Sequence, residues 1–411
     1  MKEYNLNELL KYYFGYDMLK PMQEEIVNNV LDGFDTIGLL PTGFGKSITF
    51  QLPALMLDGI TIVITPLIAL MQDQVMNLKK KAIKAEFINS LLTIEEQDII
   101  YNKLKNNKIK ILYVSAERLL SNKFLNEIKD LKIDFLVCDE AHTLLWSEDF
   151  RKALGKIPEF LKKLKKRPKM LALTATATPL TTKKICELLD LNNPKIVVGD
   201  CDRENIFYNI TKTNNKDRDL YFYIKDKENI HGLIYCITIK NVVHVYNYLK
   251  DKNIKILMYH GNLTSDEKKN VLELYKKHLV DVIVCTNAFG MGVDIPDIRY
   301  VIEYDIPQSI EDFLQQSGRA SRDGKYAEAL VLFNINDIKM NEYFIDNIEN
   351  DEKSDKEIRL IKKDRYDKLD KVCKLFLGSK CVHKSISEYF NIKYKGTCKM
   401  CSNCVKKKYN I

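Results

Sequence analysis

A glycine-rich turn between an apolar run and a helix-like segment is the feature that most constrains how this chain folds. The turn spans residues 41–47 (PTGFGKS), it follows the apolar run 36–40, and residues 47–56 have a helical composition. A strand, a glycine-rich loop and a helix N-terminus in this order direct backbone N–H groups at phosphate oxygens, with the lysine on the phosphates and the hydroxyl on Mg²⁺. The candidate contacts are Thr42, Gly43, Gly45, Lys46 and Ser47. Because Leu40 stands where the strict pattern has glycine, a purely structural turn is the alternative.

The second informative stretch is an acidic pair that follows the apolar run 135–138. Open α/β sheets bind their ligands at the carboxyl ends of parallel strands, which is where Asp139 and Glu140 are expected. Asp139 would hold Mg²⁺, and Glu140 would orient or deprotonate the attacking water. An acidic pair is also a common end for a structural strand, but the two stretches together, in this order, favour a nucleoside triphosphatase.

Length and composition indicate a soluble globular protein of two or three domains. A chain of 411 residues with 45% hydrophobic and 29% charged residues is too long for one compact core. Its longest apolar runs are far shorter than the roughly 18 residues of a membrane span, and the N-terminus lacks an apolar signal core. We therefore expect a cytoplasmic or nuclear protein with no membrane partner.

Positive charge is concentrated near the C-terminus. Residues 362–411 contain fourteen Lys or Arg and four Asp or Glu, so the rest of the chain is slightly acidic although the total net charge is +8. Such a basic appendage indicates binding to a polyanion. The alternative is a solvated tail in a chain that is rich in lysine throughout.

Two series of short apolar runs, each run followed by a helix-like stretch, predict an α/β fold with two doubly wound parallel sheets in tandem. The expected strands of the first series are 61–65, 109–114, 135–138 and 170–173, and those of the second are 232–236, 254–259, 281–285, 300–303 and 329–333. The polar stretch 211–219 is expected to end the connection between the two domains. The predicted domains are 1–207, 208–345 and 346–411.

The segment 315–324 (QQSGRASRDG) of the second series contains two arginines three residues apart, which share one face if the segment is helical. An arginine delivered across a domain cleft to a γ-phosphate can stabilise the charge of the transition state. A pair of surface arginines in salt bridges is the alternative. The site expected in the first domain favours the catalytic interpretation.

The ten cysteines fall into two groups. Six are scattered, several of them in apolar runs, as is typical of buried and inert thiols. The other four, Cys381, Cys398, Cys401 and Cys404, have the spacing C-x16-C-x2-C-x2-C. In a cytosolic protein this clustering favours a closed four-cysteine Zn²⁺ site over disulfides, with an iron–sulfur cluster as the competing metal. Zinc would also explain how a short lysine-rich segment with little core folds.

With these residues assembled, the chain resembles RecQ-type DNA helicases of superfamily 2 over nearly its whole length. Residues 14–16 (FGY) and 19–23 (LKPMQ) are similar to the family's adenine-recognition pattern, F-G-Y-x-x-F-R-P-x-Q. The segments that match other motifs of the family are 65–75 (TPLIALMQDQV), 113–119 (YVSAERL), 172–178 (ALTATAT), 287–294 (NAFGMGVD) and 315–324. The four-cysteine spacing is similar to that of the family's zinc subdomain.

The resemblance implies two tandem RecA-like domains followed by a small helical zinc-binding subdomain. It also implies ATP-driven movement along single-stranded DNA from 3′ to 5′, with Mg²⁺ and Zn²⁺ as metals and a monomer as the working form. Tyr16 and Gln23 would bind adenine, and Lys20 stands where the family usually has arginine, so base selectivity is expected to be looser. Arg322 would be the arginine finger, supported by Arg319. His142 and Gln315 are further candidate nucleotide contacts.

The implied partner is DNA, as a single strand or a tailed duplex, contacted mostly through phosphates. The candidates along its path are Thr65, Thr174, Thr176, His260 and Thr286. The family also has an aromatic-rich loop that couples DNA to hydrolysis, and the segment 142–151 offers Trp146, Phe150 and Arg151. Base stacking on such rings is worth about 1–3 kcal/mol each, and core packing is the alternative role. This loop is one residue shorter than the family's and has Glu148 in place of a histidine.

Three hypotheses compete. The leading one is a minimal DNA helicase of repair or recombination. Because the chain stops at Ile411, before the winged-helix and helical domains of many family members, we expect translocation to be better supported than efficient unwinding. An RNA helicase is the second, since the Asp-Glu-Ala-His sequence also occurs in RNA-directed relatives. A non-catalytic strand-binding or annealing protein is the third, and the presence of Lys46, Glu140 and the arginines argues against it.

Overall fold

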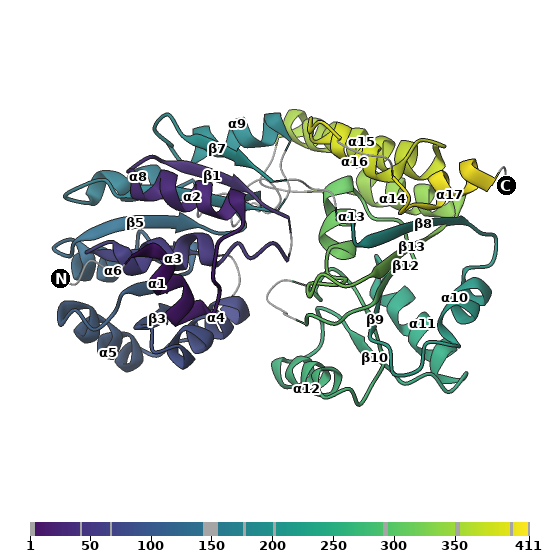
Figure 1. Cartoon of the computed structure of the whole chain (residues 1–411), viewed down its shortest axis with the longest axis horizontal. Coiled ribbons are helices and arrows are strands. Elements are labelled where there is room, and N and C mark those ends of the chain that lie inside the picture. The colour runs from purple at the N-terminus through teal and green to yellow at the C-terminus, as the bar shows by residue number, and fades with distance from the viewer. Residues whose placement is uncertain are drawn as a thin grey trace. The chain divides into compact units, whose positions relative to one another are not determined.

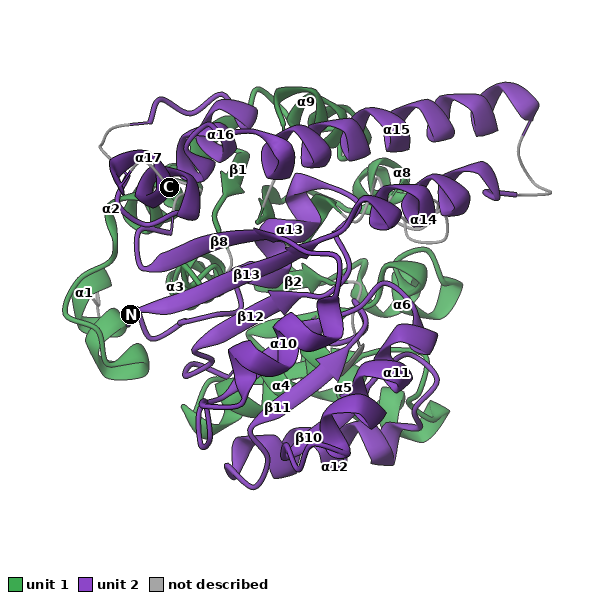
Figure 2. Cartoon of the chain, turned by 90° about the vertical axis from the view of Figure 1, so that its right-hand side faces the viewer, with its two compact units in different colours: residues 1–200 green, residues 201–411 purple. Residues whose placement is uncertain are grey.

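The computed structural model describes residues 5–41, 43–65, 68–142, 155–175, 178–199, 203–290, 295–349, 354–394 and 398–409. The chain divides into two compact units, residues 1–200 and 201–411 (Figure 2). Each unit contains one parallel β-sheet with helices packed against it (Figure 1). Among the described residues, no helix combines the length and apolar character needed to cross a membrane.

The first unit is built on a seven-stranded sheet whose order is β3-β4-β2-β5-β6-β1-β7. The strands are β1 Thr36–Leu39, β2 Ile60–Ile64, β3 Ala85–Ile88, β4 Ile111–Val114, β5 Ile133–Cys138, β6 Lys169–Thr174 and β7 Lys195–Val198. Successive residues of β2 enter different cores, with Ile62 and Ile64 on one face and Val63 on the other. Because both faces are covered, the central strands are continuously apolar rather than alternating.

Helices cover both faces of this sheet. They are α1 Leu6–Leu9, η1 Leu10–Phe14, α2 Pro21–Leu31, α3 Ile48–Met56, α4 Ile68–Lys80, α5 Ile94–Lys105, η2 Ala116–Arg118, α6 Asn122–Ile128, α8 Ile157–Lys163 and α9 Pro179–Leu188. Local sequence fixes where several of them begin. At the start of α5 the Thr93 hydroxyl accepts from the Glu96 N–H, and the Glu96 carboxylate accepts from the Thr93 N–H at 2.8 Å. This reciprocal pair satisfies two N–H groups that a helix start otherwise leaves unbonded.

The second unit is built on a six-stranded parallel sheet of order β10-β11-β9-β12-β13-β8. Its strands are β8 Ile206–Lys212, β9 Gly232–Tyr235, β10 Ile256–Tyr259, β11 Val282–Cys285, β12 Tyr300–Glu303 and β13 Ala327–Phe333. Its helices are α10 Lys216–Ile224, α11 Ile239–Lys250, α12 Ser265–Lys276, α13 Ile310–Ser317, α14 Ile335–Asp346, α15 Asp355–Leu377, α16 Val382–Tyr389 and α17 Ser402–Tyr409.

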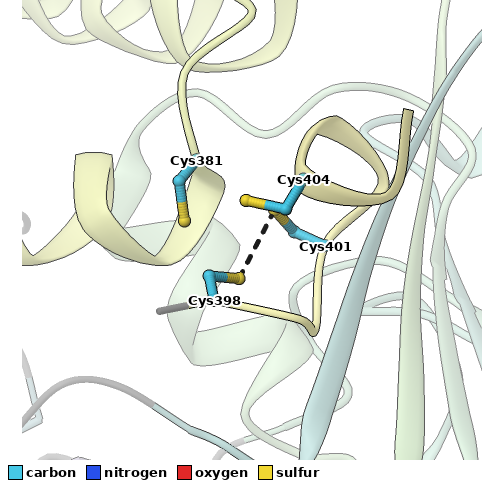
Figure 3. Close-up of side chains that lie close together, drawn as sticks. All are labelled: Cys381, Cys398, Cys401 and Cys404. Atoms are coloured by element: carbon cyan, nitrogen blue, oxygen red, sulfur yellow. Dashed lines mark hydrogen bonds between the residues drawn. The ribbon is translucent and has the colours of Figure 1, made fainter. Parts of the chain in front are cut away.

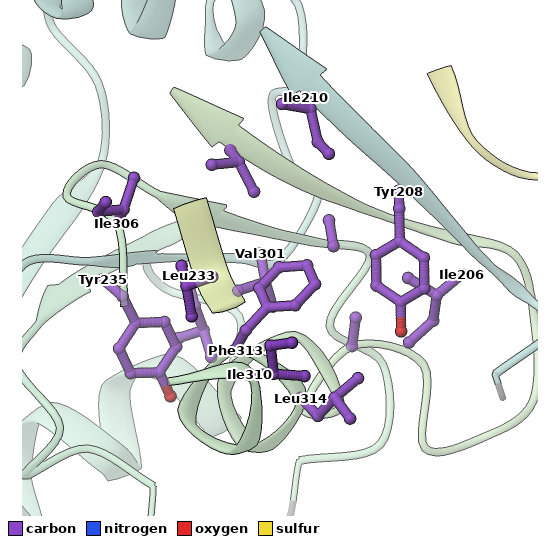
Figure 4. Close-up of a cluster of buried hydrophobic side chains, with 14 of the residues drawn as sticks. Ile206, Tyr208, Ile210, Leu233, Tyr235, Val301, Ile306, Ile310, Phe313 and Leu314 are labelled. Carbon is purple, nitrogen blue, oxygen red and sulfur yellow. The ribbon is translucent and has the colours of Figure 1, made fainter. Parts of the chain in front are cut away.

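The basic C-terminal segment shares its core with this sheet. The ring of Phe313 in α13 lies 5.4 Å from that of Tyr208 in β8 (Figure 4). It also lies 5.2 Å from the ring of Phe376 in α15. Cys401 forms an isolated parallel bridge with Tyr208, so the cysteine segment lies against the edge of the sheet at β8. The segment thus has little core of its own, and the apolar face of the sheet and α13 completes the core against which it packs.

The expected strands are confirmed to within two residues at each end. Three strands went unpredicted, and all three, β3, β7 and β8, are edge strands. An edge strand is only partly covered, so it tolerates polar residues and its apolar run is short. The expected connection at 211–219 is wrong, because these residues end β8 and begin α10 inside the second unit. The domain division at 207 and 345 stays a proposal.

Candidate nucleotide and metal sites

The candidate nucleotide site lies at the carboxyl edge of the first sheet, where β2, β5, β6 and β1 are consecutive neighbours. Backbone hydrogen bonds continue the ladders past the strand ends. The Asp139 N–H donates to the Ile64 carbonyl at 2.9 Å, and the Leu40 N–H donates to the Thr174 carbonyl at 2.9 Å. Strand order therefore brings the glycine-rich loop, Asp139 and Thr174 to one edge.

The segment expected to recognise adenine is attached directly to the glycine-rich loop. The Gln23 side-chain amide donates to the Phe44 carbonyl at 2.7 Å and to the Gly45 carbonyl at 3.3 Å. Its oxygen accepts from the Lys20 N–H at 2.9 Å, which fixes the start of α2. The Lys20 ammonium lies 4.4 Å from the centre of the Phe44 ring, a cation–π distance. Tyr16 is 59% exposed in the preceding turn.

We expect Gly45→Ala to loosen this attachment. Gly45 has a φ of +82°, which L-residues rarely adopt, and an added Cβ would lie 2.8 Å from the Gln23 side-chain nitrogen. The left-handed conformation alone costs about 1–2 kcal/mol. Gly33→Ala is the matched control, because Gly33 has a φ of +89° outside the candidate site, and an added Cβ would meet only the end of the flexible Lys169 side chain, at 3.3 Å. Urea unfolding should show a similar loss in both variants, whereas only Gly45→Ala should weaken binding of a fluorescent ATP analogue. Equal affinities would contradict the proposed attachment.

Lys46 and Glu140 form an ion pair at the centre of the site. The Lys46 Nζ lies 2.8 Å from a Glu140 carboxylate oxygen, and the two side chains are only 12% and 16% exposed. The Glu140 N–H also donates to the Asp139 carboxylate at 2.9 Å. Glu140 adopts a left-handed φ of +50°, which turns the chain sharply at the end of β5. The lysine and the two acids are thus linked directly to one another.

His142 connects the acidic pair to β6. Its Nδ1 lies 2.8 Å from the Thr174 hydroxyl and 3.4 Å from the second Glu140 carboxylate oxygen. Burial lowers the pKa of His142 to about 4, against the opposing effect of Glu140. The imidazole is therefore neutral at physiological pH and acts as a hydrogen-bonding bridge rather than as a cation.

The ionisation of Asp139 is expected to make stability depend on pH. Desolvation and the charge of Glu140 raise the pKa of Asp139 from 3.8 to about 6, while Lys46 opposes the shift. Between these values the folded chain binds more protons than the unfolded chain, so stability falls as pH rises and is level above about pH 6. Asp139→Asn should therefore raise the free energy of unfolding at pH 7.5 by about 1–3 kcal/mol, allowing for solvent screening. Urea unfolding at pH 7.5 and pH 4 is the measurement. A difference of the same size at both values would contradict this explanation.

The four clustered cysteines come together as their spacing predicts. Cys381 is the N-cap residue of α16, Cys398 and Cys401 lie on the following loop, and Cys404 lies in α17, with the four side chains gathered in one place (Figure 3). Their sulfurs all lie within 4.8 Å of one another, and those of Cys398 and Cys401 are 3.6 Å apart. A tetrahedral ion with Zn–S bonds of about 2.3 Å places its sulfurs about 3.8 Å apart. The donor set and its size fit Zn²⁺.

Backbone and histidine contacts hold the cysteine loop in place. The Met400 N–H points to the Cys398 sulfur at 3.4 Å, and the Met400 carbonyl lies 2.9 Å from His383 Nε2 and accepts from the Tyr208 N–H at 3.0 Å. His383 therefore orients the loop and is not one of the clustered donors. Among the scattered thiols, burial raises the pKa of Cys138, Cys236 and Cys285, as expected of inert cysteines.

Three family profiles match the chain in succession. They are a DEAD/DEAH box helicase domain at residues 20–185, a helicase conserved C-terminal domain at 215–324 and a RecQ zinc-binding domain at 335–405, which includes all four clustered cysteines. The "ATP-dependent DNA helicase RecQ" of Bacillus subtilis is 35% identical over 96% of this chain and 66% of its own length. The "Probable ATP-dependent DNA helicase RecS" of the same organism is 38% identical over 83% of this chain and 69% of its own length.

The chain belongs to the RecQ helicase family. It spans between about half and about two thirds of the length of the RecQ and RecS relatives. A solved structure, Mss116p bound to ssRNA and AMP-PNP, superposes with a TM-score of 0.67 at 18% identity over 95% of this chain and 91% of its own. At that identity the likeness concerns the fold alone, and it confirms two RecA-like domains.

Two glutamines of this RecQ-family chain were not selected from the sequence. The Gln74 amide donates to the Ser47 hydroxyl at 3.4 Å, and its oxygen accepts from the Gln51 amide at 2.9 Å. Gln51 lies one helical turn after Ser47, and this helical spacing could have identified it from the sequence. Gln74 lies in the motif segment 65–75. Five candidates from the sequence lie outside the described residues: Thr42, Trp146, Phe150, Arg151 and Thr176.

In the second unit, the residues expected to contact the DNA strand lie at the carboxyl edge of the sheet. The Thr286 N–H donates to the Tyr259 carbonyl at 3.2 Å, which places Thr286 beside the buried His260. Thr286 lines a cavity of about 220 Å³ together with Asn287 and Gln316. Gln316, not the half-buried Gln315, is hydrogen-bonded there to Asn287. The sequence motif contains both glutamines, and only the packing of α13 distinguishes them.

The helical arrangement considered for the two arginines is wrong. Helix α13 ends at Ser317, so Arg319 and Arg322 lie in the turns that follow. Ser321 in these turns has a left-handed φ of +50°, which a continuing helix would not allow. Arg319 is buried against Gly290, where an added Cβ would lie 2.8 Å from its guanidinium. Glycine at position 290 therefore makes room for this arginine, and the catalytic roles of both arginines stay predictions.

Proposed function

We propose that this chain is an ATP-dependent DNA motor that moves from 3′ to 5′ along a single strand and separates duplex DNA, in repair or recombination. The observation that supports this most strongly is the joining of Lys46, Glu140, His142 and Thr174 into one bonded group at a sheet edge. In a RecQ-family chain, this group links the phosphate-binding loop to a residue on the expected DNA path. We propose a monomer as the working form.

The ion pair gives Lys46 and Glu140 complementary roles. A γ-phosphate that binds Lys46 competes with Glu140 for the same ammonium, so phosphate binding releases the carboxylate to orient or deprotonate water. Asp139 and the Ser47 hydroxyl are the oxygen donors suited to Mg²⁺, which would neutralise phosphate charge. Protonated Asp139 would bind the cation poorly, so we expect hydrolysis to weaken below about pH 6.

The His142–Thr174 hydrogen bond offers a route from DNA to hydrolysis. Thr174 is the last residue of β6. Its carbonyl accepts from the N–H of Leu40, which directly precedes the glycine-rich loop. Thr65 lies at the end of β2 with a buried hydroxyl that has no hydrogen-bond partner among the described residues. A contact with the DNA strand that moves Thr174 would also move His142, which lies 3.4 Å from the Glu140 carboxylate. We propose this as one way in which DNA binding stimulates turnover.

The deciding experiment compares nucleic acids as activators and substrates of the purified chain. Hydrolysis of ATP is measured alone, with single-stranded DNA and with single-stranded RNA, and strand separation is measured on duplexes with a 3′ or a 5′ tail. We expect stimulation by DNA and separation of the 3′-tailed duplex alone. Greater stimulation by RNA would favour an RNA helicase. Strand binding without hydrolysis would favour a non-catalytic binding protein.

A further inference from the structure

A row of three polar side chains leads from the interior of the second unit to its surface. Glu303 is the last residue of β12, Gln316 lies in the last turn of α13, and Asn287 follows the end of β11 by two residues. All three line the cavity of about 220 Å³ that Thr286 also lines. Glu303 is 1% exposed and Gln316 is 8% exposed, whereas Asn287 is exposed. The row thus connects a fully buried acid to the surface beside Thr286.

The contacts along this row require one hydrogen atom on the acid. The Gln316 nitrogen donates to the Asn287 oxygen, and the Gln316 oxygen then lies 2.6 Å and 3.0 Å from the two Glu303 carboxylate oxygens. A separation of 2.6 Å is normal for an O–H···O hydrogen bond, but it is unfavourable for two oxygens without a hydrogen between them. An amide oxygen carries no hydrogen. In this arrangement the hydrogen therefore belongs to Glu303.

An ionised Glu303 would reverse the row. The Gln316 amide would then have to turn its nitrogen toward the carboxylate, which would bring its oxygen against the oxygen of Asn287. The Asn287 amide would have to turn in response and would present its oxygen to the surface. The two arrangements thus differ by one proton on the buried acid and by which end of the Asn287 amide faces outward.

The surroundings of Glu303 favour the neutral acid. Burial raises the pKa of Glu303 well above 4.5, and the charges of Asp312 and Asp305 raise it further. Asp305 is compensated by Lys216 at 3.5 Å, whereas Glu303 has no ion pair among the described residues. The other titratable or charged neighbours are Tyr235, Cys236 and Cys285, which burial keeps neutral, and Arg319, which lies near Tyr235 and Cys285.

The orientation of Asn287 bears on the DNA strand because Thr286, one residue earlier, is a candidate strand contact. With Glu303 neutral, the Asn287 nitrogen has no hydrogen-bond partner within the described part of the chain and is available to a phosphate oxygen. With Glu303 ionised, the outward oxygen of Asn287 would repel that phosphate. The cavity would also hold a second negative charge beside Asp305.

We propose that Glu303 is a positioning residue that carries a proton at neutral pH and, through Gln316, holds the nitrogen of Asn287 toward a phosphate of the bound strand. Asn287 is the residue that touches the strand, and Glu303 acts through it. This inference rests on the proposed function, because its ligand is the strand along which the motor would move.

Carbon-13 NMR tests the proton without DNA. In full-length protein labelled at the carboxyl carbon of glutamate, Glu303→Gln should remove one resonance. At pH 7.5 this resonance should have the chemical shift of a neutral carboxylic acid. A chemical shift typical of a carboxylate would overturn the proposal.

Fluorescence anisotropy with a labelled thymidine oligonucleotide tests the contact. Asn287→Ala should raise the Kd about tenfold, as expected for the loss of one hydrogen bond to a charged group. Glu303→Met should raise it to a similar extent. Glu303→Gln should restore the wild-type Kd, because its amide nitrogen can donate to Gln316 as the acid does. Gln308→Met is the matched control, because Gln308 lines the same cavity outside the row, and its Kd should equal that of the wild type.

A double-mutant cycle separates positioning from a general loss of structure. Gln316→Met should raise the Kd of the wild type about tenfold but leave the Kd of Asn287→Ala unchanged, since both changes remove the same contact. A further loss in the Asn287→Ala background, or equal Kd values for Glu303→Gln and Glu303→Met, would overturn the proposal. A wild-type chain that did not bind the oligonucleotide would contradict the proposed function and this contact together, and the carboxyl resonance would still decide whether Glu303 is protonated.

Discussion

Replacing Glu140 with glutamine is expected to reduce the rate of ATP hydrolysis by about two to four orders of magnitude. Glutamine has nearly the same shape but cannot accept a proton, and it also lacks the charge that pairs with Lys46 at 2.8 Å. Lys46 would be more available to phosphate in this variant, so nucleotide affinity should be unchanged or higher. The measurements are the kcat of DNA-stimulated hydrolysis and the Kd of a fluorescent non-hydrolysable analogue.

Glu159→Gln is the matched control for this change. Glu159 lies in α8 of the same unit, is exposed and pairs with Lys163 at 3.3 Å across one helical turn. Such exposed pairs contribute well under about 1 kcal/mol, so both constants should equal those of the wild type. If Glu140→Gln hydrolysed ATP at the wild-type rate, the assignment of the water-activating role to Glu140 would be withdrawn. A loss of binding in parallel with kcat would instead indicate a damaged site.

Cys401→Ser is expected to release the metal of the four-cysteine site and to destabilise the second unit. Structural zinc contributes about 10–16 kcal/mol of apparent binding free energy in small domains, much of which depends on a complete ligand set. Cys401 is fully buried and pairs with β8, so the change also reaches the sheet edge. Because the segment shares its core with the sheet, we expect a partly folded chain with α17 detached. Zinc content, thermal unfolding and hydrogen exchange of residues 398–409 would show this.

Cys373→Ser supplies the comparison. Cys373 is a half-buried thiol of α15 that packs against the same core but is not among the four clustered sulfurs. This variant should retain its zinc and lose at most a small part of its stability. A Cys401→Ser protein that kept both its metal and its melting temperature would remove Cys401 from the ligand set.

Features carried by a few contiguous residues could be predicted from the sequence. The glycine-rich loop, the acidic pair and the cysteine spacing are local patterns, and central parallel strands are recognisable because both of their faces are buried. The edge strands β3, β7 and β8 were missed because their exposed sides relax that pattern. The basic segment was expected to have little core because the apolar face that completes it comes from another part of the chain.

The bonds that make a site out of these motifs were decided by the tertiary structure. The Lys46–Glu140 pair joins residues 94 apart, and the His142–Thr174 contact joins residues 32 apart. The attachment of Gln23 to the glycine-rich loop is also a tertiary contact, between α2 and the loop after β1. The Lys46–Glu140 and His142–Thr174 contacts depend on which strands are neighbours, and strand order results from the packing of the whole sheet rather than from any local window. The sequence thus determined which chemical groups are present, and the order of the strands determined which of them touch.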